Sequence, residues 1–106
     1  MMHYVGSMVT SLLSSTAVLV TAHSSNPWKC SVHNAATGEF IGSIEHGESI
    51  FHGYSQFVWD VTIQGGGILE CPSLEEAVEE LKIAPAFPTE AGNRNYSKAV
   101  YKETSY

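Results

Sequence analysis

The sequence predicts an α+β fold, with a small antiparallel sheet of three or four strands and one helix packed on a face of that sheet. Two patterns support this prediction. Large apolar side chains occupy every second position of residues 57–63, which is typical of a strand with one buried face. After residue 72, apolar side chains recur at helical spacing, at Leu74, Ala77, Val78 and Leu81.

Three shorter segments complete the predicted sheet. Trp28, Cys30 and Val32 share one face of a first strand, because alternate side chains of a strand point the same way. A second strand is expected over residues 39–45, and a short fourth strand over residues 68–71. Turns between the strands are placed at residues 34–38, 46–49 and 64–67.

The helix has clear start and stop signals. Ser73 and Glu76 have the spacing of a capping box, in which the serine hydroxyl accepts a hydrogen bond from an amide of the first turn. Pro85 and Pro88 stop the helix, because proline lacks the backbone N–H that a helix interior requires. The predicted helix therefore spans residues 73–83.

The chain of 106 residues has the length of one domain. Pro27 lacks a backbone donor and disfavours the helical region for Asn26, so a boundary is expected there. Residues 1–27 are predicted to form an N-terminal arm with room for an extra strand or helix, and residues 28–84 the β-sheet-plus-helix domain. Residues 85–106 are predicted to form a polar C-terminal tail.

Charge is distributed unevenly along the chain, whose formal net charge is −6. Between Lys29 and Lys82 there are nine acidic residues and no lysine or arginine, whereas Arg94, Lys98 and Lys102 lie near the C-terminus. An acidic surface repels nucleic acid and anionic lipid. We therefore expect no direct contact with nucleic acid or membrane, and a protein partner with a basic surface.

The apolar run of residues 8–20, followed by the small residue Ala22, is similar to the core of a signal peptide. The first seven residues lack the lysine or arginine of a leader, however, and the run is too short for a membrane span. We therefore expect a cytoplasmic protein in which Cys30 and Cys71 are reduced. The alternative is an exported protein with a cleaved leader and a Cys30–Cys71 disulfide.

Catalytic and metal-binding patterns are not found in the sequence. Cys30 and His33 would point to opposite faces of a strand, whereas zinc requires convergent ligands. The glycines at residues 65–67 lack the Lys-Ser or Lys-Thr of a phosphate-binding loop, and no Gly-x-Ser-x-Gly motif occurs. We expect no enzyme activity, no metal and no cofactor.

A cluster of glutamates on the predicted helix is the candidate partner-binding site. Its members lie on the solvent side of the helix, and Asp60 of the sheet is added to them. The predicted site residues are Glu75, Glu76, Glu79, Glu80 and Asp60. Such a patch could meet a basic surface. The alternative is a solvated face that keeps a small domain soluble.

One resemblance bears on the function. Trp28, the turn at residues 34–38, Phe40, Gly42 and the segment Ser73-Leu74-Glu75-Glu76-Ala77-Val78 resemble the sheet-plus-helix modules of integrase arm domains and of small phage inhibitors such as anti-CRISPR proteins. Arm domains use a basic sheet, and this sheet is acidic. The resemblance to the inhibitors implies a viral or mobile-element protein that inhibits a nucleic-acid-handling protein.

The sequence therefore predicts a small acidic, non-enzymatic binding protein that docks on a basic partner. A second alternative is a small ligand-binding domain that uses Phe51 and Tyr54 around His52. An apolar pocket converging on His52 would favour that alternative.

Overall fold

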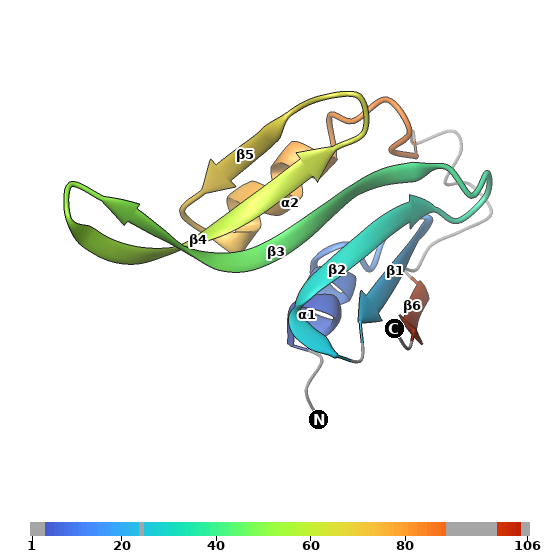
Figure 1. The fold of residues 1–106 in the computed structure, drawn as a ribbon. Coiled ribbons are helices and arrows are strands. Elements are labelled where there is room, and N and C mark those ends of the chain that lie inside the picture. The colour runs from blue at the N-terminus through green and yellow to red at the C-terminus, as the bar shows by residue number, and fades with distance from the viewer. Residues whose placement is uncertain (1–3, 24, 89–99, 105–106) are drawn as a thin grey trace.

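The fold is α+β, with more elements than the sequence predicts. The computed structural model describes residues 4–23, 25–88 and 100–104. Its elements are α1 (Tyr4–Leu12), β1 (Val18–His23), β2 (Asn26–Asn34), β3 (Phe40–Phe51), β4 (Tyr54–Ile63), β5 (Ile68–Cys71), α2 (Leu74–Leu81) and β6 (Val100–Thr104). The strands form one sheet of order β5-β4-β3-β2-β1-β6 (Figure 1).

Strands β1 to β5 pair antiparallel, each with its neighbour along the chain, whereas β6 pairs parallel with β1. The prediction of three or four strands and a single helix therefore underestimates the number of strands and helices. The missing elements are α1 and β1, which fall within residues 1–27, and β6, which falls within residues 85–106. Residues 89–99 of the predicted tail lie outside the described residues.

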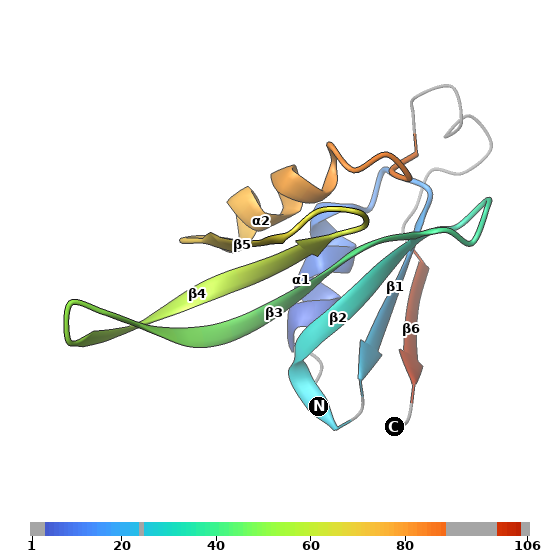
Figure 2. The same ribbon diagram turned by 45° about the horizontal axis from the view of Figure 1, so that its top comes forward.

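Both helices cover the same face of the sheet (Figure 2). Helix α1 packs mainly on β1 and β2, and α2 packs on β3, β4 and β5. One continuous core lies between the helices and the sheet; its fully buried members include Val9, Val20, Val32, Ile44, Val61 and Leu81. None of the helices in the described part of the chain is long and apolar enough to cross a membrane.

Helix α1 follows from apolar side chains spaced four residues apart. Val5, Val9 and Leu13 are fully buried, and the Thr10 hydroxyl donates a 2.8 Å hydrogen bond to the Gly6 carbonyl. The serines and threonines between the apolar positions face outward or satisfy themselves on the helix backbone. Because the side chains of α1 and β1 share the core of the later strands, the core continues across Pro27.

The turn expected at residues 46–49 is wrong. Strand β3 continues through these residues, and its pairing with β4 runs without interruption from Gly42 opposite Ile63 to Phe51 opposite Tyr54. The turn lies instead at His52 and Gly53, whose φ angles are 51° and 80°. Positive φ at both central residues is the geometry of a two-residue type I′ hairpin turn, which matches the twist of the strands that it joins.

Helix α2 packs closely on the sheet at Gly42. A Cβ atom at this position would overlap the Thr62 carbonyl oxygen and lie 2.7 Å from Cδ2 of Leu81. Leu81 is fully buried and belongs to the apolar stripe of α2. The absence of a side chain at Gly42 therefore allows α2 to rest directly on β3 and β4.

We predict that Gly42→Ala destabilises the protein by about 1–3 kcal/mol, because the added methyl group must displace packed atoms. Gly67→Ala is the matched control, since a Cβ there meets nothing within 4 Å. Urea denaturation of both variants measures the effect. Equal stability of the two variants would contradict the packing of α2 on Gly42.

Cys30 and Cys71 are free and buried. Strands β3 and β4 lie between β2, which carries Cys30, and β5, which carries Cys71. Three interstrand spacings amount to about 14 Å, whereas a disulfide requires Cα atoms within about 7 Å. The Cys30–Cys71 disulfide of the exported alternative is therefore incompatible with this sheet.

Burial raises the pKa of the Cys30 thiol from 9.0 to about 12, although a backbone hydrogen bond with Ile44 opposes the shift. The folded state therefore keeps a proton that the unfolded state releases above pH 9.0. Stability should be unaffected by this thiol below pH 9.0 and should fall between pH 9.0 and about pH 12.

We predict that Cys30→Val removes this fall, which amounts to about 2 kcal/mol at about pH 10.5. Urea denaturation of the parent and the variant at several pH values provides the comparison, and other titrating groups cancel between the two proteins. Parallel curves for parent and variant would show that the Cys30 thiol is not held protonated by burial.

Candidate functional site: the hairpin extension

The predicted glutamates lie on the outer side of α2. Glu75, Glu76 and Glu79 are exposed and Glu80 is half-buried. The Ser73 hydroxyl accepts a 3.2 Å hydrogen bond from the Glu76 amide, which confirms the predicted cap. Glu79 Oε2 also pairs with Lys82 Nζ at 3.0 Å. Because this pair is exposed, it contributes little to stability and leaves a strongly acidic helix surface.

Asp60 lies apart from the glutamates of α2, on the sheet face that the helices leave uncovered. It stands directly opposite Glu45 on one side and Glu70 on the other, and Lys29 stands opposite Glu45. These four side chains form a row across the sheet. Oδ1 of Asp60 is buried, and no other described residue forms a hydrogen bond with it. The structure therefore divides the predicted site between two surfaces.

Carboxylates from both surfaces act electrostatically on the thiol of Cys71. Burial raises the pKa of Cys71, and the negative charges of Glu80, Glu76 and Asp60 raise it further. Negative potential thus accumulates near the start of α2, where Cys71 ends β5. Within the described ranges, no group of three His, Cys, Asp or Glu side chains gathers as a metal site would.

A long hairpin beyond the sheet is the feature that sequence reasoning missed. The pairing of β2 with β3 ends at Lys29 and Glu45, and the pairing of β4 with β5 ends at Trp59 and Cys71. Residues 46–58 therefore continue as a two-stranded ribbon, and among the described residues each strand has only the other as a strand neighbour. We call residues 46–58 the hairpin extension (Figure 1).

The hairpin extension exposes large apolar side chains. Ile50 and Tyr54 are each 76% exposed and Phe57 is 68% exposed. Glu48 is the single charged side chain of these residues. The pairing register places Ile50 and Phe57 on one face of the ribbon and Tyr54 on the other. Sheet edges are commonly protected by charges, prolines or covering elements, and exposed apolar surface is typical of interaction sites. The hairpin extension therefore combines exposed apolar side chains with a single charged residue.

An aromatic group lies at the base of the hairpin extension. Trp28 of β2, His46 of β3 and Phe57 of β4 line a cavity of about 390 Å³, which we call the aromatic cup. The His46 ring lies 5.5 Å from that of Trp28 and 5.2 Å from that of Phe57. The His46 ring also stacks on the Trp59 ring, with centroids 4.0 Å apart and an interplanar angle of 10°.

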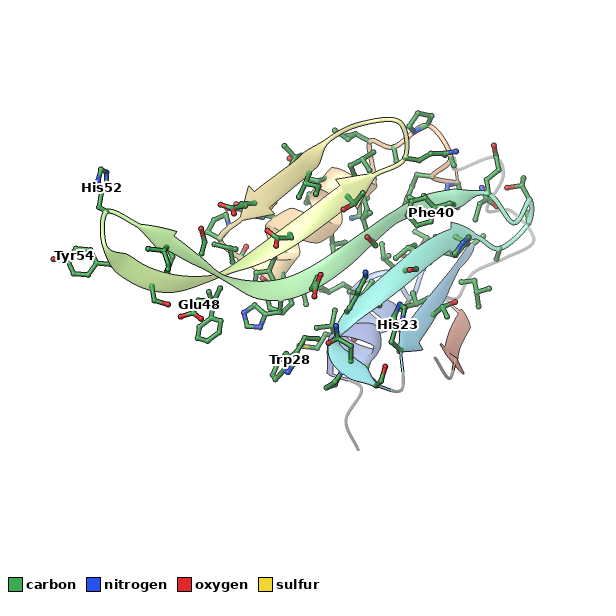
Figure 3. All side chains as sticks on the ribbon, viewed as in Figure 1. His23, Trp28, Phe40, Glu48, His52 and Tyr54 are labelled. Carbon is green, nitrogen blue, oxygen red and sulfur yellow. The ribbon has the colours of Figure 1, made fainter. Side chains whose placement is uncertain are left out.

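Side-chain alternation places Glu48 beside the aromatic cup. Glu48 pairs directly with Phe57 and lies two residues from His46, so the three side chains project from the same face of the ribbon. Figure 3 shows Glu48 and Trp28 on the same side of β3. The cup thus combines aromatic rings with one adjacent carboxylate.

The tip of the hairpin extension carries His52 and Tyr54, both of which are exposed (Figure 3). The ligand-binding alternative required an apolar pocket converging on His52, and an exposed tip does not provide one. The side chain of Phe51, the third residue of that alternative, lies outside the described residues.

The sequence did contain one signal for this site. His-Gly between two runs with strand character, at residues 52–53, resembles the Asn-Gly signal of a type I′ hairpin.

Comparisons with protein-family models, with curated proteins and with solved structures find no match for this chain.

Proposed function

We propose that this chain is a small non-enzymatic binding protein that docks on the basic surface of a protein partner through its hairpin extension. The observation that carries the proposal is the ribbon of residues 46–58, which exposes Ile50, Tyr54 and Phe57 beyond the helix-covered sheet. Large apolar and aromatic side chains supply most of the energy of protein interfaces.

Charge supports a basic partner. The net charge is −6, and carboxylates lie on the hairpin extension, on the uncovered sheet face and on α2. Negative potential of this kind accelerates encounter with a positive surface and disfavours nucleic acid or anionic lipid as the direct ligand. In this proposal the apolar extension supplies affinity, while Glu75, Glu76, Glu79, Glu80 and Asp60 steer the approach.

A basic protein surface commonly serves to bind nucleic acid. A small acidic protein that covers such a surface would compete with the nucleic acid, so the proposal includes an inhibitory role. The anti-defence activity of a virus or mobile element, which the sequence resemblance implies, is one form of this role. Its support is the acidity of the chain and the resemblance.

A comparative capture experiment tests the proposal. The parent, the tip variant Ile50→Ser/Tyr54→Ser and the control Ile83→Ser are each immobilised, and proteins retained from a lysate are identified by mass spectrometry. Ile83 is 75% exposed and follows α2, so the control removes a comparable apolar side chain away from the extension. We expect a partner that the parent and the control retain and the tip variant loses.

The captured partner is then purified and its association rate is measured at about 50 and about 500 mM salt. Screening should slow association at high salt, because the Debye length shortens from about 14 to about 4 Å. Glu79→Gln/Glu80→Gln should slow association at low salt while unfolding like the parent. Retention of the same proteins by the parent and the tip variant would contradict the proposal.

A further inference from the structure

The sheet divides at the base of the hairpin extension. Beyond Lys29 and Glu45, β2 no longer pairs with β3, and Asn26 pairs instead with His23 of β1. Strand β3 continues into the extension without a strand on that side among the described residues (Figure 1). An unpaired edge of this kind offers backbone N–H and C=O groups to an added strand.

The aromatic cup opens at this division, because its members come from the separating strands. Trp28 belongs to β2, which turns away, whereas His46 belongs to β3, which continues. Their rings are tilted by 57°, and the rings of His46 and Phe57 by 44°. Trp28 is 44% exposed and Phe57 is 68% exposed, so the cup is accessible from solvent.

The cup has the chemistry of a site for a cation. A Trp or Phe ring attracts a cation that lies over its face, and the carboxylate of Glu48 lies beside Phe57. Guanidinium fits better than ammonium, because it is planar, stacks on aromatic rings and can donate to a carboxylate at the same time. Among the described residues, those that line the cavity include no lysine or arginine.

We propose that an extended, arginine-bearing segment of the partner adds as a strand to the open edge of β3 and places its guanidinium group in the aromatic cup. This inference rests on the proposed function and specifies the chemistry of its partner. Charge complementarity selects this occupant over a second copy of the chain, because two copies would each bring a net charge of −6 to the interface.

The probe is a capped seven-residue peptide of alternating threonine and valine with arginine at its centre. Matched peptides carry citrulline, which is the neutral isostere of arginine, or lysine at that position. Binding is followed by the amide and indole N–H resonances of the labelled protein. We expect shifts at the Trp28 indole and at the amides of residues 46–51, and about three- to tenfold weaker binding of the citrulline peptide.

Three variants locate the effect. Trp28→Leu keeps an apolar side chain but removes the ring, and should abolish the preference for arginine over citrulline. Glu48→Gln should reduce that preference. Ile83→Ser is the control, because Ile83 is 75% exposed, lies outside the hairpin extension and does not line the cup. If Trp28→Leu fails to fold, Phe57→Leu replaces it, since Phe57 is 68% exposed.

Equal affinity for the arginine and citrulline peptides, or an unchanged preference in the ring variants, would overturn the cup. Concentration-dependent dimerisation that Phe57→Leu abolishes would also overturn it, because a second copy would then occupy the edge. If the peptide or dimerisation experiment gives either of these results, but the parent still captures a partner that the tip variant loses, the proposed function stands. If the parent and the tip variant retain the same proteins while the arginine peptide still binds specifically, the proposed docking is rejected and only the preference of the cup for guanidinium stands.

Discussion

The pairing of β3 with β4 is the interaction on which the other features depend. It runs in continuous register from Gly42 and Ile63 to Phe51 and Tyr54, and extends beyond the strands on either side. Its inner half supplies Ile44 and Val61 to the core beneath the helices. Its outer half has no such cover and forms the hairpin extension, so one strand pair provides both the stable body and the exposed element.

Burial of the side chains decreases gradually from the inner half of this strand pair to its outer half. Gly42 lets Leu81 of α2 rest on the sheet at the inner end, and Trp59 is half-buried where the cover ends. His46 stacks on Trp59 and leads to the exposed Phe57, so the aromatic rings continue the core outward into solvent. The proposed docking function rests on this apolar surface, which the helix-covered sheet holds in place and which is open at the edge of β3.

Much of the fold was predictable because its signals are local. The strand of residues 57–63, the strand of residues 68–71 and the capped helix follow from alternation, helical spacing and Ser73. In the segment that forms α1, serines and threonines between the apolar residues obscured the helical spacing. The glycine and polar residues at 46–49 have the composition of a turn, although they lie within a strand. The pairing of β6 with β1 joins distant segments, which local patterns cannot report. The exposed glutamates of α2 were predictable for the same reason as the helix, whereas the aromatic cup depends on the register of three strands.

Amide hydrogen exchange along β3 tests the central claim most directly, namely that an ordered ribbon with an open edge extends from the sheet. Residues 42–45 lie between β2 and β4, so their amides should all exchange slowly. Residues 46–51 have only β4 beside them among the described strands, so slow and fast amides should alternate along the chain. Uniformly slow exchange at residues 46–51 would show that another chain covers the edge. Uniformly fast exchange there would show that the hairpin extension is not formed.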